Sequence, residues 1–269
     1  MKAMIFAAGL GTRLKPITDT LPKALVPVCG QPLLYHVARK LQASGINDAV
    51  VNVHYFADKI EHWLSEQDWI VSSPQLPSDN VMRIDVSDER AMLLETGGAV
   101  LHARRLLEGC GSFLIHNVDI LSDCDLDWLK SQVKPDAIAT LLVSNRATSR
   151  YMLFHPDTMR LVGWTNRSTG ETIMTFNDIR PEDCKALAFS GIHILSDKVF
   201  ALMDEYVKDR QLPVSPSGVK FSITTGFYLW ASSRVPIYGV EPDSLKFVDV
   251  GKIETLTLAE EFLKGQHSY

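Results

Sequence analysis

The feature that most constrains this chain is an unbroken apolar run over residues 3–8, which passes directly into a loop containing Gly9 and Gly11. Short apolar runs bounded by glycine are typical of strands buried on both faces, as in the interior of a parallel sheet. Parallel strands need long crossover connections, which are usually helices. The first residues therefore predict an α/β protein whose first strand lies inside the sheet.

The rest of the chain alternates between helical and strand-like patterns. Residues 32–44 carry apolar side chains at helical spacing, and Gly45 is a stop signal after them. The same criteria predict further helices over 56–64, 98–107, 197–207, 222–232 and 253–264, and strands over 49–53, 81–86, 113–116, 137–143, 151–164, 186–195, 235–240 and 247–250. This rhythm indicates a Rossmann-like, three-layer α/β/α fold with a mixed, mostly parallel central sheet. Because no linker rich in Pro, Gly or Ser is present, we expect a single domain over 1–269, with halves of about 1–145 and 146–269.

Composition and charge exclude several broad classes of protein. Hydrophobic residues make up 46% of the chain and charged residues 22%, which provides enough apolar material for a large core. The formal net charge is −5 at pH 7 and there is no long Lys/Arg run, so a nucleic-acid partner is not expected. No apolar run reaches the roughly 18 residues of a membrane span, and the N-terminus lacks a signal-peptide pattern. We therefore expect a cytoplasmic protein without a membrane partner.

The loop after the first predicted strand has the chemistry of an anion site. Glycines at positions 9 and 11 let backbone N–H groups approach phosphate oxygens, and Arg13 adds a guanidinium fork. In open α/β sheets, ligands bind at the carboxyl ends of the strands, where this loop lies. The loop matches neither the P-loop pattern nor the dinucleotide fingerprint, whose third glycine is replaced by Leu14. Taken alone, a tight turn with a solvated Arg13 is as good an interpretation as an anion site.

The residues that follow extend this loop into a longer motif. From Gly9 to Lys23 the chain reads Gly-x-Gly-Thr-Arg-x-x-Pro-x-Thr-x-x-x-Pro-Lys. At these positions it resembles the sugar-1-phosphate nucleotidyltransferases, enzymes that make an NDP-sugar and pyrophosphate from an NTP and a sugar 1-phosphate. The resemblance implies that Arg13 and Lys23 are catalytic and act on the phosphates. It also implies that the nucleotide is bound by Ala8, Gly9, Gly11 and Thr12.

Later motifs resemble other parts of the same family. Residues 94–99 look like its second nucleotide loop, which implies binding by Glu95, Thr96, Gly97 and Gly98. Asp119, after a predicted strand, resembles the metal-binding aspartate, although this chain has Val118 where most relatives have Gly. Asp249 resembles the second aspartate that shares the metal; taken alone, it fits a helix cap better than a ligand. Together the two carboxylates imply Mg²⁺ as the cofactor. Residues 189–193 resemble the family's sugar-pocket segment, although taken alone they also fit an ordinary central strand with one glycine. The resemblance implies that the sugar contacts Asn117, Ser190 and Gly191.

The resemblance also bears on the substrates. The Leu-Glu-Thr-Gly-Gly sequence over 94–98 and the single-domain length look most like N-acetylmuramate-1-phosphate uridylyltransferases, which favours UTP and N-acetylmuramate 1-phosphate. Mannose-1-phosphate guanylyltransferases are also similar. Arg150 and Arg167 are candidate cations for the lactyl carboxylate of N-acetylmuramate, although both also fit a solvated surface. Two other classes stay open, a sensor domain that binds a nucleotide sugar without turnover and a nicotinamide dehydrogenase.

Overall fold

The structure, a computed structural model, describes residues 1–78 and 80–266 and divides the chain into two compact units. Unit 1 contains residues 1–93, residues 115–127 and the chain from Leu245 onward; unit 2 contains residues 94–114 and 128–244. The expected halves do not coincide with these units, because the chain leaves unit 1 after residue 93, returns at 115 and leaves again after 127. That the whole chain forms one nucleotidyltransferase domain remains a prediction.

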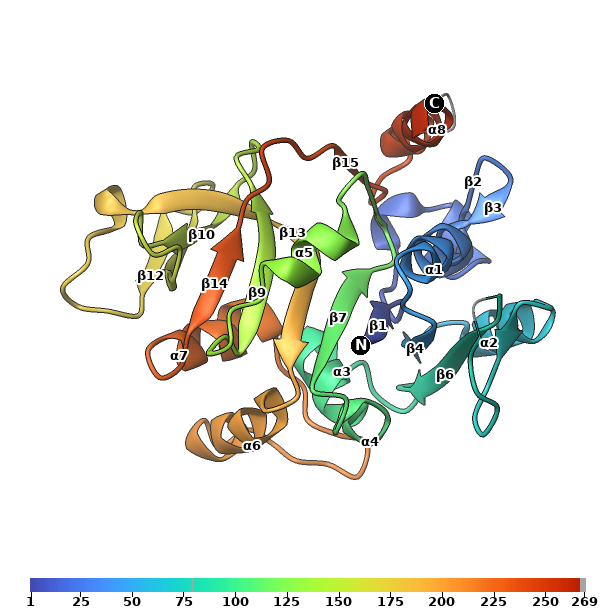
Figure 1. The fold of residues 1–269 in the computed structure, drawn as a ribbon, viewed down its shortest axis with the longest axis horizontal. Helices are drawn as coiled ribbons and strands as arrows, with labels where there is room; N and C mark the ends of the chain where they lie inside the picture. The colour runs from blue at the N-terminus through green and yellow to red at the C-terminus, as the bar shows by residue number, and fades with distance from the viewer. Residues whose placement is uncertain (79, 267–269) are drawn as a thin grey trace. The chain divides into compact units, whose positions relative to one another are not determined.

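Unit 1 is an α/β unit around parallel strands (Figure 1). Its strands follow the order β1-β4-β6-β5, and the pairs β1–β4, β4–β6 and β5–β6 are parallel. Short 3-10 helices follow β1 at Thr12–Leu14, Ile17–Asp19 and Lys23–Leu25. The elements are β1 (Lys2–Phe6), β2 (Pro27–Val28), β3 (Gln31–Pro32), α1 (Leu33–Ala43), β4 (Asp48–Val53), α2 (Ala57–Ser65), β5 (Ile70–Val71), β6 (Met82–Asp88), β8 (Ile120–Ser122), β15 (Phe247–Asp249) and α8 (Glu254–Gln266).

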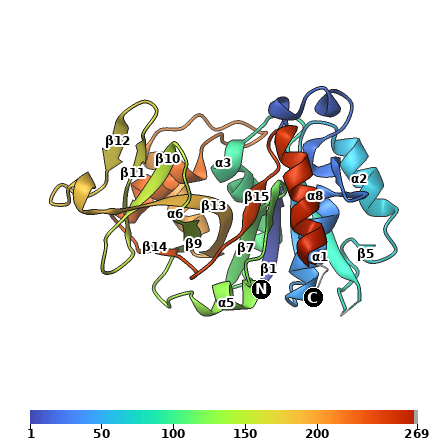
Figure 2. The same ribbon diagram turned by 90° about the horizontal axis from the view of Figure 1, so that it is seen from above.

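The predicted first strand and first helix are confirmed. Ala3, Met4 and Ile5 of β1 have no exposed surface, as expected for a strand inside the sheet. Helix α1 ends where the glycine predicted: the Gly45 N–H donates to the Gln42 carbonyl at 2.9 Å, and the Ile46 N–H donates to Leu41 at 3.0 Å. Gly45 has φ +74°, so this is a Schellman end that requires a residue tolerant of the left-handed conformation. Helix α8 lies beside α1 (Figure 2).

Unit 2 combines antiparallel strands with helices. Strand β13 pairs antiparallel with β10 and with β9, and β10, β11 and β12 form an antiparallel meander. Strand β14 pairs parallel with β9. The elements are α3 (Glu95–His102), α4 (Arg104–Leu107), β9 (Ala139–Ser144), β10 (Arg150–Phe154), β11 (Leu161–Asn166), β12 (Glu171–Met174), a 3-10 helix (Pro181–Asp183), β13 (Lys185–Ser196), α6 (Val199–Asp209), a π-helix (Ile223–Tyr228), α7 (Leu229–Ser232) and β14 (Ile237–Val240). Strand β7 (Ser112–Asn117) and helix α5 (Leu126–Ser131) have residues in both units.

The predicted fold class, α/β with a mixed central sheet and flanking helices, is confirmed. The prediction of one strand over 151–164 is wrong, because the chain turns between β10 and β11 at the segment containing Pro156 and Asp157, two turn-forming residues. The predicted helix over 98–107 is divided into α3 and α4 at Ala103. The short strands β2, β3, β5, β8 and β12 and helix α5 were not predicted.

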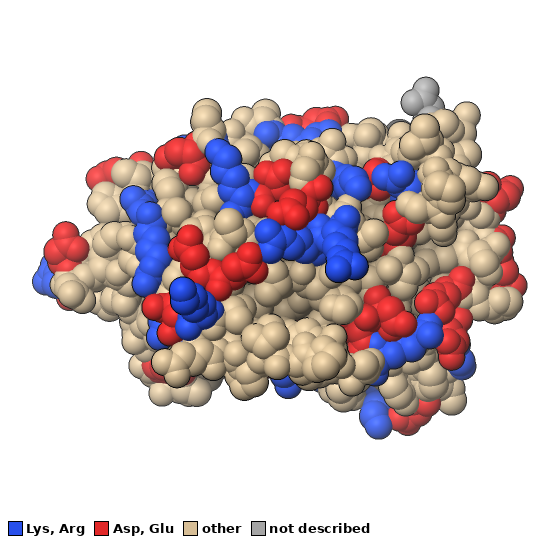
Figure 3. Space-filling view, turned by 90° about the horizontal axis from the view of Figure 1, so that it is seen from below, with Lys and Arg blue, Asp and Glu red and all other residues tan. Residues whose placement is uncertain are grey.

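Charged side chains of both signs lie in small neighbouring groups on the face drawn in Figure 3. Ion pairs join charged side chains in several elements of the protein; Arg104, for example, contacts Glu108 at 2.9 Å and Asp204 at 2.7 Å. Within residues 1–78 and 80–266, none of the helices has the length and apolar character that crossing a membrane requires.

Candidate functional site

The glycine loop begins where β1 leaves the sheet. Ala8 is buried and Gly9 is exposed, and Gly11 adopts a left-handed backbone with φ +62°. A Cβ at position 11 would lie 2.9 Å from the Thr18 Cγ2 atom, and the Thr18 hydroxyl donates to the Gly11 carbonyl at 2.8 Å. The motif thus requires glycine at 11, because the left-handed backbone disfavours a side chain and Thr18 leaves no room for one. Buried Thr18 also fixes the loop through its hydrogen bond to the Gly11 carbonyl. Exposed Thr12 follows as the first residue of a 3-10 helix.

Arg13 extends from that 3-10 helix toward the end of β15. A Cβ at Gly251 would lie 2.7 Å from the Arg13 Nη2 atom and 2.7 Å from the Asp249 Oδ1 atom. Glycine at 251 therefore leaves room for the guanidinium beside the carboxylate. This packing explains why a glycine stands two residues after Asp249.

Lys23 is a buried cation, with only 8% of its surface exposed. It is the first residue of the 3-10 helix that follows Pro22, and its Nζ atom forms an ion pair with the Asp119 Oδ2 atom. Burying an ammonium group is costly unless a counter-charge is close, and Asp119 supplies that charge. The Lys23 and Asp119 side chains are 10% and 19% exposed, so the ion pair is largely shielded from water.

A two-stranded ribbon joins Asp119 to Asp249. Strands β8 and β15 pair antiparallel with Asp249 opposite Ile120, and the Val250 N–H donates to the Asp119 carbonyl at 2.8 Å. The two predicted metal ligands, 130 positions apart in the sequence, therefore have neighbouring backbones. Val118 is 3% exposed, so its branched side chain packs inside the protein.

This cluster in unit 1, which we call the phosphate site, consists of the glycine loop with Arg13, Lys23, Asp119 and Asp249. Its two carboxylates suit Mg²⁺, which is usually held by one or two carboxylates together with substrate phosphates and water. Among residues 1–78 and 80–266 there is no group of three or more His, Cys, Asp and Glu arranged to hold a metal. This donor set fits an ion whose coordination would be completed by substrate oxygens. It fits a closed structural site, in which the protein supplies all the ligands, less well.

A histidine near the phosphate site is kept neutral. His116 is completely buried in β7, and burial lowers its pKa to about 4 despite the nearby Asn117 carbonyl, 2.8 Å from its Nδ1 atom. A backbone carbonyl only accepts, so the Nδ1 atom carries the proton. At pH 7 the neutral ring adds no charge beside the predicted ligands.

The predicted second nucleotide loop forms the start of α3 in unit 2. The N–H groups of Gly97 and Gly98 both donate to the Phe221 carbonyl, at 2.9 and 3.2 Å, and the Thr96 hydroxyl accepts from the Ile223 N–H at 3.0 Å. These donors are therefore already used within the protein. Glu95 has φ +61°, which is unusual for a residue with a side chain. Nucleotide binding by these residues remains a prediction.

Unit 2 also contains a pocket of about 580 Å³. Its lining combines cations with aromatic rings and polar groups: Arg146, Thr148, Arg150, Tyr151, Met152, Trp164, Asn166, Glu171, Ile173, Phe189, Ser222, Thr224 and Thr225. We call this the polar–aromatic pocket. Flat rings with hydrogen-bonding groups between them suit a small polar ligand with apolar faces.

The predicted sugar residues lie in different places. Ser190 is buried, and its hydroxyl donates to the Leu142 carbonyl at 2.8 Å. Gly191, with φ +80°, lies where the register between β13 and β9 shifts. Neither lines the polar–aromatic pocket, and Asn117 is the last residue of β7 in unit 1. Sugar contacts for these three residues remain a prediction.

Among the candidate cations for a sugar carboxylate, Arg150 lines the pocket and Arg167 does not. The Arg167 guanidinium lies over the Tyr151 ring, 4.3 Å from its centroid. Arg146, whose Nη2 atom donates to the Phe189 carbonyl at 3.2 Å, was not among the predicted residues. Its position two residues after the end of β9 was the available signal, because ligand groups gather at strand ends.

Comparisons with known proteins agree on one family. The Nucleotidyl transferase family model matches residues 2–264. The chain is 35% identical over 204 residues to N-acetylmuramate α-1-phosphate uridylyltransferase from Caulobacter vibrioides, covering 74% of this chain and 76% of that protein. It is 33% identical over 123 residues to the catalytic subunit beta of mannose-1-phosphate guanylyltransferase from Xenopus tropicalis, covering 46% of this chain and 32% of that protein.

Solved structures share the fold. A putative glucose-1-phosphate thymidylyltransferase from Bacillus anthracis, in complex with a sucrose, has a TM-score of 0.70 at 22% identity. The match covers 97% of this chain and 94% of that one. At this level of identity the likeness concerns the fold alone.

Proposed function

The chain belongs to the nucleotidyl transferase family, and we propose that it joins the nucleotidyl group of an NTP to a sugar 1-phosphate, releasing pyrophosphate. The predicted resemblance and the prediction of a nucleotidyltransferase enzyme are confirmed by a match over residues 2–264. The observation that carries the proposed chemistry is the phosphate site, where Arg13, Lys23, Asp119 and Asp249 come together in one unit. We also propose that the enzyme works in the cytoplasm.

The reaction needs positioning and charge stabilisation more than a protein nucleophile. A phosphate oxygen of the sugar 1-phosphate attacks the α-phosphorus of the NTP. The new P–O bond forms as the bond to the pyrophosphate oxygen breaks, and the bonding electrons leave with pyrophosphate. Because the attacking phosphate is already ionised near neutral pH, the main requirement is to hold anions together in line.

The side chains of the phosphate site suit these tasks. In the proposal, Arg13 stabilises the charge that develops on pyrophosphate, because a guanidinium fork matches phosphate oxygens. Lys23 binds the sugar phosphate and the α-phosphate as a buried point charge. Gly9, Gly11 and Thr12 contribute backbone N–H groups. Asp119 and Asp249 would hold Mg²⁺, which neutralises and orients phosphate oxygens when bound.

For the substrates, we propose UTP and N-acetylmuramate 1-phosphate. The support is similarity to the Caulobacter uridylyltransferase over 74% of this chain, together with the cations of the polar–aromatic pocket. The lactyl group of N-acetylmuramate carries a carboxylate, and Arg146 and Arg150 are cations that could pair with it. The alternative, GTP with mannose 1-phosphate, is favoured by the shorter similarity to the Xenopus guanylyltransferase.

Assays with several pairs of NTP and sugar 1-phosphate test both the proposed transferase reaction and the proposed substrates. Pyrophosphate release would be measured with UTP or GTP against N-acetylmuramate, N-acetylglucosamine and mannose 1-phosphates in the presence of Mg²⁺. We expect UTP with N-acetylmuramate 1-phosphate to exceed GTP with mannose 1-phosphate at least tenfold in kcat/KM, about 1.4 kcal/mol of transition-state binding. The reverse ratio would overturn the substrate assignment alone. Binding without pyrophosphate release from any pair would overturn the transferase proposal in favour of a sensor.

A matched pair of variants assigns that activity to the phosphate site. Asp249→Asn removes a charged oxygen with little change in volume and is expected to lower kcat about 100-fold or more. Asp243→Asn makes the same change at an exposed position in the segment that leads into β15, and should leave kcat unchanged. Equal activity of the two variants would remove Asp249 from the proposed metal site.

A further inference from the structure

A buried chain of hydrogen bonds reaches the first residue of the glycine loop. The Ala7 N–H donates to the Asn52 Oδ1 atom at 2.7 Å, and the Asn52 Nδ2 group donates to the Glu89 Oε1 atom at 2.8 Å. Ala7, Asn52 and Glu89 are 3%, 4% and 2% exposed. A carboxylate this deeply buried is costly unless it has a specific task or specific partners, and the proposed reaction uses neither Asn52 nor Glu89.

The backbone of Glu89 is also fixed. Its N–H donates to the Val53 carbonyl at 2.8 Å, and the His54 Nδ1 atom lies 2.7 Å from its carbonyl oxygen. Since that oxygen only accepts, the His54 Nδ1 atom is the donor. The segments that follow β4 and β6 therefore lock Glu89 in place, and Glu89 in turn orients the Asn52 amide.

The position of this chain connects it to the phosphate site. Asn52 is the register partner of Phe6, the last residue of β1, and Glu89 directly follows β6. Ala7 is the residue at which the backbone leaves the sheet and turns into Ala8 and Gly9. At the far side of the loop, Thr18 holds Gly11. Asn52 thus fixes the near end of a loop whose N–H groups must point in one direction to bind phosphate.

We propose that Asn52 and Glu89 are positioning residues for NTP binding, and that their hydrogen bonds hold the glycine loop in its anion-binding shape before the nucleotide arrives. This inference rests on the proposed function of the loop. Preorganised donors bind more tightly because ordering is complete before association. Loss of the hydrogen bonds should therefore weaken NTP binding more than it weakens binding of the sugar phosphate.

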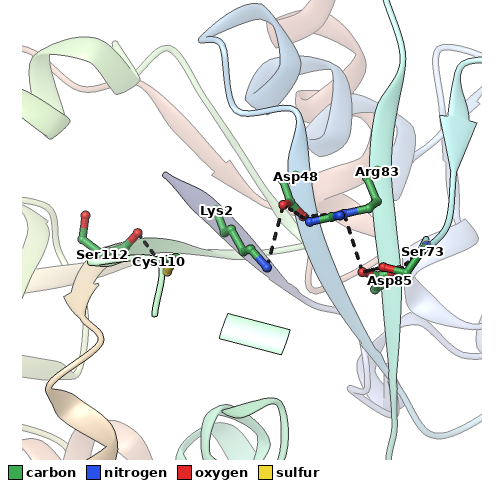
Figure 4. A network of polar contacts seen from close by, with 7 residues as sticks. All are labelled: Lys2, Asp48, Ser73, Arg83, Asp85, Cys110 and Ser112. Carbon is green, nitrogen blue, oxygen red and sulfur yellow. Dashed lines mark hydrogen bonds and ion pairs between the residues drawn. The ribbon is translucent and has the colours of Figure 1, made fainter. Parts of the chain in front are cut away.

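A purely structural role would also explain buried hydrogen bonds between strands, and the chain itself provides the control. Figure 4 shows a second polar network, at the amino ends of the same strands. There Lys2 of β1 lies 3.8 Å from Asp48 of β4, and the Arg83 Nε atom of β6 donates to Asp48 at 3.2 Å. Asp48 is four residues before Asn52 along β4, about 13 Å away at strand spacing. Removing Asp48 perturbs the same strands but leaves the loop untouched.

The experiment compares Asn52→Ala, Glu89→Ala, Glu89→Gln and Asp48→Ala in the full chain. Calorimetry would measure binding of UTP and of GTP with Mg²⁺ and no sugar phosphate, and thermal unfolding would report stability. Steady-state kinetics would give the KM of each substrate. We expect the two alanine variants at 52 and 89 to bind the NTP at least tenfold more weakly, with a smaller change in the KM of the sugar phosphate. Asp48→Ala should lower the melting temperature but bind the NTP like the wild type.

Glu89→Gln separates the hydrogen bond from the charge. Glutamine keeps an Oε1 atom that accepts from Asn52, so this variant should bind the NTP within about threefold of the wild type. Weakening equal to that of Glu89→Ala would overturn the positioning role, and so would equal weakening in Asp48→Ala. A wild-type chain that binds neither UTP nor GTP would overturn the proposed function as well. Wild-type binding that persists in Asn52→Ala overturns this inference alone.

Discussion

At the scale of single residues, Glu95 has the most unusual backbone in the predicted binding loops. It is the first residue of α3 and has φ +61°, where a Cβ costs about 1 kcal/mol. Its ion pair with Lys220, at 3.6 Å, joins side chains that are 45% and 55% exposed, so it contributes little stability. Strain of this kind is concentrated at ligand sites, which agrees with the proposed role of the loop.

The strain at Glu95 can be measured with a pair of substitutions. Glu95→Gly should be more stable than Glu95→Ala by about 1 kcal/mol, because glycine adopts the left-handed conformation without a Cβ clash. At Glu205, an exposed residue inside α6, the order should reverse by a similar amount, since glycine is a poor residue for a regular helix. Urea unfolding of the four variants gives both differences. Glu95→Ala equal to or more stable than Glu95→Gly would show that position 95 is not strained.

At the scale of elements, the glycines of α3 have a packing role that the sequence did not reveal. A Cβ at Gly98 would lie 2.0 Å from the Val219 carbonyl oxygen, and one at Gly97 would lie 2.3 Å from the Phe221 ring. Phe221 can move its ring, whereas the Val219 carbonyl belongs to the backbone. Because Gly97 and Gly98 lack side chains, the start of α3 can contact the segment that precedes the π-helix.

Gly98→Ala should therefore destabilise the protein by about 3 kcal/mol, the upper end of the usual cost of overpacking. Gly265→Ala is the matched control, because a Cβ at that helical position meets nothing within 4 Å. Urea unfolding would be followed by circular dichroism. A loss below about 0.5 kcal/mol for Gly98→Ala would mean that the helix start shifts freely and that the contact is not required.

Features that depend on neighbouring residues could be predicted from the sequence, whereas features that depend on distant strands could not. Local patterns predicted α1 and β1, because helical spacing, apolar runs and a left-handed glycine are readable within a few residues. The charged residues of the phosphate site were named through the family motif. The β8–β15 ribbon that joins Asp119 to Asp249, and the hydrogen bonds from Glu89 to Ala7, depend on strands far apart in the sequence. Arg146 is different, because its position just after the end of β9 is a local signal that was overlooked.

At the scale of the whole molecule, the free energy of unfolding depends on a histidine that folding removes from water. His116 is completely buried, and burial lowers its pKa from 6.5 to about 4. Between these two values the unfolded chain binds a proton that the folded chain does not, so stability rises with pH in this window. The stability that depends on a neutral His116 is fully present above pH 6.5 and is lost progressively as the pH falls toward 4.

The pH dependence of stability through His116 can be measured with a substitution that removes the imidazole. Lowering the pH from 7 to 5 should cost the wild type about 2 kcal/mol more than it costs His116→Gln, which has no imidazole to protonate. The comparison uses each variant's own change between the two pH values, because glutamine in a buried site also lowers stability at both. His62→Gln is the control, since that side chain is 74% exposed and its ion pair with Glu66 contributes little stability, so it should lose the same free energy as the wild type to within about 0.5 kcal/mol. Urea unfolding at pH 7 and pH 5 measures all three differences. Equal losses of free energy in the wild type and in His116→Gln would show that folding does not lower the pKa of His116, and would overturn this prediction.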